Sequence, residues 1–163
     1  MKLTLAVLAV AVALASLACE RPPAEVNGVG EYVLGKTLRR DMEGKARCEP
    51  INDGKETHCM VASSIRLGAQ AAQTSLYFQG TAPASPLLEI ALTVRVCRLN
   101  DAIAALVGAL GDPSDGSTEK LRFWRLGRMF VSAKLPAQGG IQCEVNFVTT
   151  ADKQRVADLE AGE

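Results

Sequence analysis

Apolar and polar residues alternate most regularly between residues 87 and 98. One side of this segment carries Leu88, Ile90, Leu92, Val94 and Val96, and the other carries Glu89, Thr93 and Arg95. Residues at every second position of a strand point to the same side of a sheet. The pattern therefore predicts a strand with one buried side.

Further segments have the composition and length of strands, and turn-forming residues separate them. These segments are residues 59–67, 74–79, 120–125, 129–135 and 141–149. Asp53-Gly54 and the Pro-containing run 81–86 are turn signals, and such short connections favour antiparallel pairing. We expect an antiparallel sheet.

The clearest helix is predicted over residues 101–110. Asn100 is a suitable N-cap, apolar residues follow at helical spacing, and Gly111 with Pro113 ends the pattern. A short helix is expected from Leu38 to about residue 46, with Thr37 as its N-cap, and a third helix over 151–159.

These elements predict an α+β fold in which two short helices pack on an antiparallel sheet. Their order reads helix, three strands, helix, three strands, which is compatible with two αβββ repeats. A shift of 63 positions aligns Thr37 with Asn100 and Pro50 with Pro113, although the residues between them match poorly. An internal duplication is therefore a hypothesis.

The N-terminal residues have the pattern of an export signal. Lys2 precedes an apolar run over 3–15 that is too short to span a bilayer, and small residues lead to Cys19. We expect a signal peptide over 1–18, a lipidated Cys19 with a flexible tether over 19–30, and one domain over 31–163. Because Ser16 stands where lipoprotein signals usually have Leu, ordinary cleavage after Ala18 is the alternative.

Localisation follows from the same residues. Glu20, rather than the Asp that retains lipoproteins in the inner membrane of enteric bacteria, favours an outer-membrane lipoprotein that faces the periplasm. The alternative is a soluble periplasmic protein.

The count of five cysteines fits this interpretation. If Cys19 carries the lipid, Cys48, Cys59, Cys97 and Cys143 remain for two disulfides in an oxidising compartment. We expect the first two to pair and the last two to pair, although four cysteines allow three pairings. Pro50 lacks the N–H that a tight hairpin would need, so we expect a loose loop between Cys48 and Cys59.

The overall charge gives no reason to expect a polyanionic partner. Eighteen basic residues balance eighteen acidic ones, so we expect no attraction to nucleic acid. Residues 30–37 (Gly30 to Thr37) match the phosphate-loop pattern G-x-x-x-x-G-K-[ST]. Pro22, Pro23 and Asn27 precede it where a buried strand is required, so we expect no nucleotide.

Candidate catalytic and metal-binding residues are few. His58 is the single histidine, and the sequence indicates no nucleophile, base and orienting group that act together. The cysteines form no C-x-x-C pair, so disulfides are favoured over a metal site. We expect no enzyme, no cofactor and no metal.

Basic and aromatic residues are interleaved over 120–128. A possible partner surface comprises Arg122, Trp124, Arg125 and Arg128. In a strand, Arg122 and Trp124 would share one side while Phe123 and Arg125 share the other, so an ordinary amphipathic strand is the alternative.

The run from Asn100 to Pro113, followed by Trp124 in the next strand, resembles small envelope lipoproteins of the SmpA/OmlA type. The resemblance covers about 25 residues plus the lipid signal. It implies helices packed on an antiparallel sheet, as in β-lactamase-inhibitor-like domains, and an accessory role in outer-membrane assembly. Four further cysteines and a greater length depart from that family and weaken the assembly role.

The expected function is a non-catalytic envelope module that binds a partner protein, as an accessory or scaffold subunit. A periplasmic module that binds lipid or another small ligand is the alternative, and a hydrolase is the least favoured.

Overall fold

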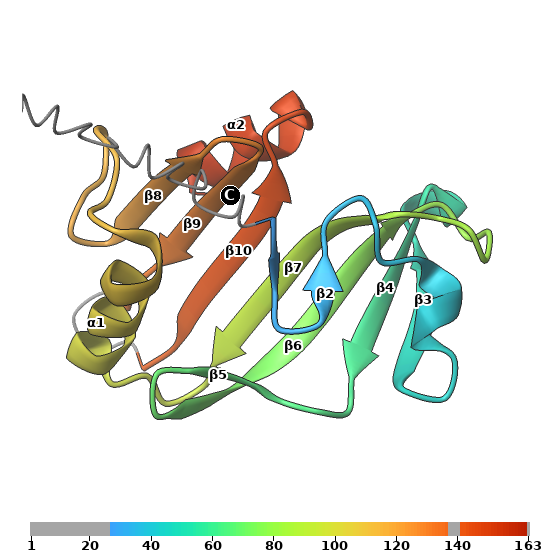
Figure 1. The fold of residues 1–163 in the computed structure, drawn as a ribbon, viewed down its shortest axis with the longest axis horizontal. Coiled ribbons are helices and arrows are strands. Elements are labelled where there is room, and N and C mark those ends of the chain that lie inside the picture. Colours follow the sequence, from blue (N-terminus) through green and yellow to red (C-terminus); the bar gives the residue numbers. More distant parts are fainter. Residues whose placement is uncertain (1–26, 137–140, 163) are drawn as a thin grey trace, which may run out of the picture.

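An antiparallel β-sheet forms the centre of the computed structural model, which describes residues 27–136 and 141–162 (Figure 1). The strands follow the order β3-β4-β6-β7-β10-β9-β8, and β5 pairs separately with β6. Their bounds are β3 (Ala46–Ile51), β4 (Glu56–Val61), β5 (Ile65–Leu67), β6 (Gln70–Gln79), β7 (Leu87–Val94), β8 (Leu121–Leu126), β9 (Met129–Lys134) and β10 (Cys143–Thr149). An antiparallel hairpin of β1 (Gly28–Val29) and β2 (Tyr32–Val33) precedes the sheet.

Two α-helices cover opposite sides of the sheet. Residues of α1 (Leu99–Leu110) and of the β1–β2 hairpin pack into the main core on one side, and Figure 1 shows both in front of the sheet. On the other side, Leu159 of α2 (Lys153–Ala161) packs with Phe123, Phe130 and Val148 of β8, β9 and β10. The α+β class and the antiparallel sheet are confirmed, whereas the two helices do not lie together on one side.

The predicted burial of β7 holds over most of its length. Ile90, Leu92 and Val94 are buried in the main core. At the start of the strand Leu87 is buried instead of Leu88, because a β-bulge shifts the register between Tyr77 and Phe78 of the neighbouring strand. Val96, predicted to be buried, is 72% exposed because the strand ends at Val94.

The helix predicted from Leu38 is much shorter in the structure. It is a single 3-10 turn, η1 (Arg39–Met42), whose Met42 is buried in the core. Thr37 does not cap it, since its hydroxyl accepts a hydrogen bond from the Val33 N–H at 2.8 Å. Five strands, rather than three, separate η1 from α1, because 46–51 is a strand and 59–67 divides between β4 and β5.

The helix α1 lies close to its predicted position. It begins at Leu99, with Arg98 rather than Asn100 at the N-cap, and ends at Gly111. Gly111 has a φ of 82°, which explains why a glycine ends this helix. Ala102 and Leu106 are its buried residues.

Cys48 and Cys59 form a disulfide across the β3–β4 hairpin, directly opposite one another. The loose loop expected here is wrong, since Pro50 lies within the ladder opposite Thr57. The Cα atoms of the cysteines are 4.0 Å apart, a separation typical of the narrow pair that exchanges no backbone hydrogen bonds. Pro50, two residues further on, occupies the same kind of pair, so its nitrogen points to the open edge of the sheet.

Cys97 and Cys143 form the second disulfide. It lies where β7 has ended and β10 begins, so it closes the connection that runs through α1, β8 and β9. Both expected cysteine pairs are therefore present.

The outer edge of β8 is covered by the loop that precedes it. Phe123 N–H donates to the Ser117 hydroxyl at 2.9 Å, and Arg125 N–H donates to the Ser114 hydroxyl at 3.1 Å. The Ser114 N–H in turn donates to the Phe123 carbonyl at 2.7 Å. These bonds satisfy backbone groups that an edge strand would otherwise expose.

No helix within 27–136 or 141–162 is long and apolar enough to cross a membrane. Cys19 and the predicted signal peptide lie outside the described residues.

The two disulfides should differ in their contribution to stability. Cys97 and Cys143 are 46 positions apart and Cys48 and Cys59 are 11 apart. The chain-entropy treatment gives about 4 kcal/mol for the longer loop and about 3 kcal/mol for the shorter one. Urea unfolding should therefore show a larger loss for the double variant C97S/C143S than for C48S/C59S, and the opposite order would contradict this account.

Candidate functional site

The side of the sheet that carries α2 is only half covered. The helix packs on β8, β9 and β10 and reaches β4 and β7 through Arg155 alone. Several other outward side chains of β4, β6 and the end of β7 are exposed or only partly buried. We call this area the open sheet side, and it consists of His58, Met60, Gln73, Ser75, Tyr77, Thr93 and Arg95. Strict alternation in β6 and β4 produces it, because the intervening residues face the main core.

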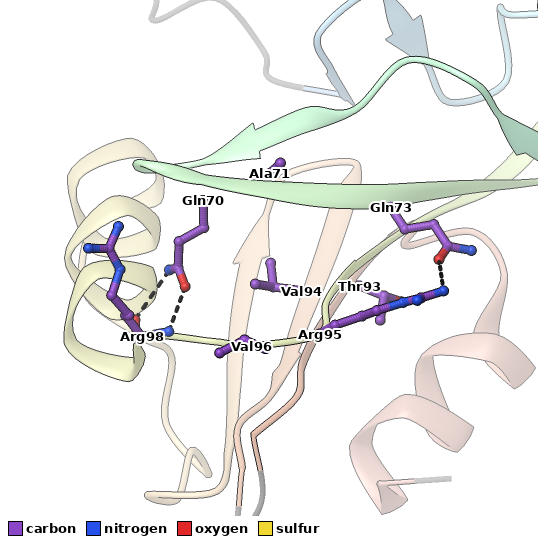
Figure 2. Close-up of a pocket in the computed structure, with 8 residues that line it drawn as sticks. All are labelled: Gln70, Ala71, Gln73, Thr93, Val94, Arg95, Val96 and Arg98. Carbon is purple, nitrogen blue, oxygen red and sulfur yellow. Dashed lines mark hydrogen bonds between the residues drawn. The ribbon is translucent and has the colours of Figure 1, made fainter.

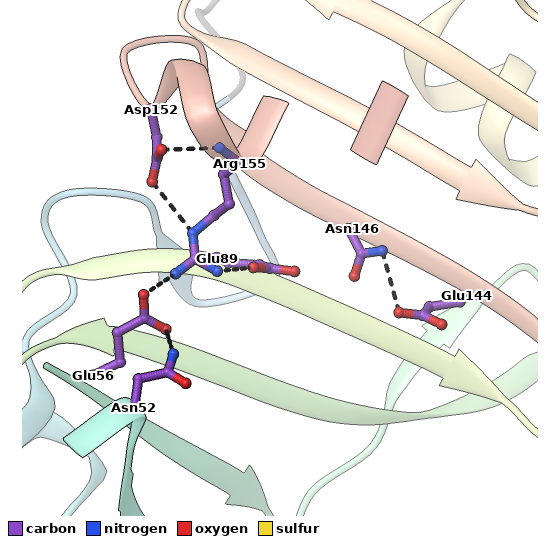
Figure 3. A network of polar contacts seen from close by, with 7 residues as sticks. All are labelled: Asn52, Glu56, Glu89, Glu144, Asn146, Asp152 and Arg155. Atoms are coloured by element: carbon purple, nitrogen blue, oxygen red, sulfur yellow. Dashed lines mark hydrogen bonds and ion pairs between the residues drawn. The ribbon is translucent and has the colours of Figure 1, made fainter. Parts of the chain in front are cut away.

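Arg155, in the first turn of α2, connects the helix to the open sheet side (Figure 3). Its guanidinium forms ion pairs with Glu56 of β4 at 2.6 Å and with Glu89 of β7. Its Nε also donates to Asp152 at 3.3 Å. Asp152 is the N-cap of α2 and accepts the Arg155 backbone N–H at 3.1 Å. One cation therefore joins the helix terminus to two strands.

The protonation of this network is set by burial and by the ion pairs together. Burial raises the pKa of the Glu89 carboxyl above its ordinary value, although the neighbouring Arg155 acts in the opposite direction. For Arg155, burial lowers the pKa, but the charge of Glu89 and the bonds to Glu56 outweigh it, so the pKa is raised. Arg155 therefore stays charged while Glu89 binds a proton more readily than an exposed glutamate.

His58, Ser75 and Tyr77 form a second cluster on neighbouring strands. His58 Nε2 lies 3.0 Å from the Ser75 hydroxyl oxygen, and its Nδ1 lies 3.7 Å from a carboxylate oxygen of Glu49. The imidazole stacks on the Tyr77 ring at a centroid distance of 5.0 Å. His58 thus lies on an interior strand, and its side chain is mostly buried.

This cluster has the connectivity of a nucleophile, a base and an orienting carboxylate, which the sequence did not indicate. Acyl transfer also needs donors aimed at the developing oxyanion. The N–H groups around Ser75 belong to a central strand that pairs with β4 and β7, so they serve the sheet and are not directed at a substrate. The geometry describes a stacked polar cluster that fixes the orientation of Tyr77.

A cleft of about 490 Å³ opens at one end of the open sheet side (Figure 2). It forms because the β6–β7 ladder ends where Gln73 faces Thr93, after which β6 continues with β5 as its partner. At the far end of the cleft the Gln70 side chain accepts the Arg98 N–H at 2.5 Å and donates to the Arg98 carbonyl at 3.3 Å. The Gln70 side-chain amide thus makes the two hydrogen bonds with Arg98 that the backbone of a neighbouring strand would otherwise make.

Charged and polar side chains line the mouth of this cleft. Arg95 donates to the Gln73 side-chain oxygen at 3.4 Å, and Arg98 pairs with Asp101 at 3.1 Å. The cleft is therefore continuous with the open sheet side through Gln73 and carries two guanidinium groups.

The four residues of the predicted partner surface do not lie together. Trp124 is 1% exposed, and its indole N–H donates to the Gly111 carbonyl at 2.9 Å, so it belongs to the core. Arg125 lies on the side of α2, where it pairs with Glu160 and lies over the Phe130 ring. Arg122 is partly buried and Arg128 is exposed. The separation of Trp124 from Phe123 follows the expected strand alternation.

The phosphate-loop pattern falls on the β1–β2 hairpin and the turn after it. The N–H groups of Leu34, Gly35 and Thr37 donate to the backbone carbonyls of Asn27, Leu87 and Val33, respectively. The Leu34 and Thr37 donors close the hairpin and the turn after it, and the Gly35 donor joins the turn to β7, so the three do not point into a shared concave loop.

The residues of the Arg155 network were not predicted from the sequence. A weak signal was present, because Glu89 is an acidic residue inside the most regular apolar strand, and because Asp152 and Arg155 have capping spacing. Nothing in the sequence indicated that Glu56, 99 positions before Arg155, would be their partner.

Among the residues that the structure describes, no cluster of three or more His, Cys, Asp or Glu side chains is placed to hold a metal ion. Comparisons of the chain with protein families, with curated proteins and with solved structures find no match.

The raised pKa of Glu89 predicts a pH-dependent contribution to stability. A carboxyl with a higher pKa in the folded chain than in the unfolded chain stabilises the fold while it is protonated, and this contribution is lost as pH rises through the folded pKa. The free energy of unfolding of the native protein relative to E89Q should therefore decrease as the pH rises from below the ordinary pKa of a glutamate through the raised pKa of Glu89. Urea titrations of both proteins measure it. An increase over that range would mean that the Arg155 ion pair dominates over burial.

Proposed function

We propose that this chain is a lipid-anchored protein of the bacterial outer membrane that faces the periplasm and binds a partner protein through the open sheet side. The anchor is the lipid on Cys19. Because residues 28 and 29 belong to β1, the tether is shorter than expected and comprises the residues between Cys19 and the β1–β2 hairpin. The role is that of a non-catalytic accessory or scaffold module. The resemblance of residues 100–113 to small envelope lipoproteins supports the same role.

The observation that carries this proposal is the half coverage of one side of the sheet by α2. Antiparallel sheets commonly leave one side in water, and the side chains of that side are then polar. Here Met60 is 45% exposed, and it lies beside Gln73, whose amide contacts the Met60 sulfur at 3.4 Å. Methionine, aromatic residues and arginine are the residue types that protein interfaces favour.

The rigidity of this surface also supports a binding role. Tyr77 is held between the His58 ring and Arg155, whose guanidinium lies 6.0 Å from the Tyr77 ring centroid. An aromatic side chain that is already fixed loses little conformational entropy when a partner covers it. We infer that Tyr77 is the central contact of the surface, and that Arg95 at the cleft mouth favours an acidic segment of the partner.

A photo-crosslinking amino acid placed at Tyr77 tests the surface. In intact cells it should form a covalent adduct of one defined mass, whereas the same amino acid at Ala104, exposed on α1 on the opposite side of the sheet, should not. In the Tyr77-labelled chain, R95E should reduce the adduct because it reverses the charge at the cleft mouth. Equal adducts at both positions, or none at Tyr77, would exclude the open sheet side as the interface.

The anchor is tested separately by mass spectrometry of the N-terminal peptide from the membrane fraction. We expect that peptide to begin at Cys19 and to carry acyl chains. An unmodified terminus at position 19 would instead indicate a soluble periplasmic protein.

A further inference from the structure

Three exposed apolar residues gather at the end of the sheet where β7 leads into α1. Val96 is 72% exposed, Ile141 is 62% exposed and Leu99, the first residue of α1, is 37% exposed. The Cys97 N–H donates to the Ile141 carbonyl at 2.6 Å, so the chain after β7 and the chain before β10 lie side by side. Single exposed apolar residues are ordinary, whereas several that adjoin one another mark a contact surface. We call Val96, Leu99 and Ile141 the apolar tip.

Covalent and hydrogen bonds hold the apolar tip in place. The Cys97–Cys143 disulfide joins its two segments. Just after Cys97, the Gln70 side chain accepts the Arg98 N–H at 2.5 Å and donates to the Arg98 carbonyl at 3.3 Å. A surface fixed in this way has little conformational entropy left to lose when it is covered. The fold therefore keeps these apolar side chains exposed and ready for contact.

Two arginines border the apolar tip. Arg95 precedes Val96 in the chain, and its guanidinium donates to the neutral side chain of Gln73 at 3.4 Å. Arg98 pairs with Asp101 at 3.1 Å, and its side chain is 65% exposed. Apolar groups beside arginines suit the interface of a bilayer, where apolar groups enter the boundary of the acyl chains and guanidinium groups meet the lipid phosphates.

The length of the tether places the domain close to a bilayer, and this part of the inference rests on the proposed lipid anchor. Residues 20–27 separate Cys19 from β1. Even fully extended, these residues would reach only about 28 Å. Part of the domain surface must therefore lie near the lipid headgroups whenever the anchor is inserted.

The small size of the apolar tip favours a bilayer over a protein as the surface that covers it. A stable protein interface covers about 800 Å² on each partner, which is far more than three side chains supply. A domain that is already anchored needs no such area, because the anchor keeps the bilayer at a high effective concentration.

We propose that the apolar tip docks on the phospholipid bilayer that holds the anchor. Val96 and Ile141 enter the boundary between headgroups and acyl chains, and Arg98 contacts the phosphates. Because the tip lies at the ends of the strands, docking leaves the centre of the open sheet side, around Tyr77, accessible to the partner protein. The contact thus sets the orientation in which the domain presents its partner surface.

A photo-crosslinking amino acid in place of Val96 tests this contact in intact cells. The full chain should gain the mass of a phospholipid, whereas the same amino acid in place of Met60, which is 45% exposed on the open sheet side, should capture no lipid. The proposed partner surface is judged by the protein adduct at Tyr77 instead. A lipid adduct at position 96 without a protein adduct at Tyr77 would uphold the tip and exclude the partner surface, and the reverse result would do the opposite.

Vesicle sedimentation provides a second measurement. The exported full chain with Cys19→Ser, which has no lipid at that position, should partition onto vesicles of phosphatidylcholine and phosphatidylglycerol. V96D/I141D should lower the partition coefficient about tenfold or more, because two side chains lose their burial in the bilayer. M60D, the same kind of change at an exposed apolar residue away from the tip, should leave the coefficient unchanged. Since this chain has no anchor, the result does not depend on whether Cys19 carries a lipid in cells.

Four results would each overturn the proposal. They are the absence of any adduct at position 96, a protein adduct there in place of a lipid adduct, the absence of measurable partition of the Cys19→Ser chain, and equal effects of V96D/I141D and M60D. Thermal unfolding shows whether each variant is folded. If V96D/I141D does not fold, the adducts at positions 96 and 60 decide the question.

Discussion

The pairing of β7 with β10 is the interaction on which the rest of the structure depends. Strand β7 ends a group of neighbouring strands that runs from β3 to β7, and β10 belongs to a second group that runs from β8 to β10. Among the described strands, only the β7–β10 ladder joins the two groups into one sheet. Its paired residues lie between 49 positions (Val94 and Cys143) and 59 positions (Glu89 and Val148) apart in sequence, so forming it costs considerable chain entropy. The Cys97–Cys143 disulfide sits at the end of the same ladder and reduces that cost. Because α1 lies within the connection and α2 follows β10, the ladder also determines where both helices are placed.

The placement of α2 then determines which part of the second side remains exposed. Leu159 holds the helix on β8 to β10, and Arg155 reaches across to strands of the first run. A partly buried cation with several carboxylate partners contributes little net stability, since desolvation offsets much of the attraction, but loss of the cation leaves a buried carboxylate such as Glu89 unpaired and is costly. We therefore regard the network as a device that fixes the position of the helix. Beside it, Tyr77 is held in one orientation on a surface that is otherwise open.

The sequence predicted those features that depend on local pattern. Three such features were predicted, namely the alternation in β7, the end of α1 at Gly111 and the cysteine pairs. Each follows from residue spacing within one segment or from the number of cysteines. The exchange of Leu87 for Leu88 was not visible, because the bulge depends on the register with β6. The pattern after Thr37 suggested a helix, yet packing of Met42 against the core required only one turn. Trp124 illustrates the limit for sites. The alternation separated it from Arg125, but it could not show that both sides of the strand would be covered, by the main core on the side of Trp124 and by α2 on the side of Phe123.

The two edge strands of the sheet, β3 and β8, limit how this chain can pair with other molecules. At one border of the sheet Pro50 directs a nitrogen without hydrogen outward, and at the other Ser114 and Ser117 occupy the outward donors of β8. Neither border offers the uninterrupted row of backbone groups that lets one sheet extend into the next molecule. Crowding would therefore not drive these molecules to assemble border to border into fibrils. Other molecules must therefore bind this chain through its side chains. Side chains differ from protein to protein and can provide specificity, whereas backbone hydrogen bonds are common to all proteins.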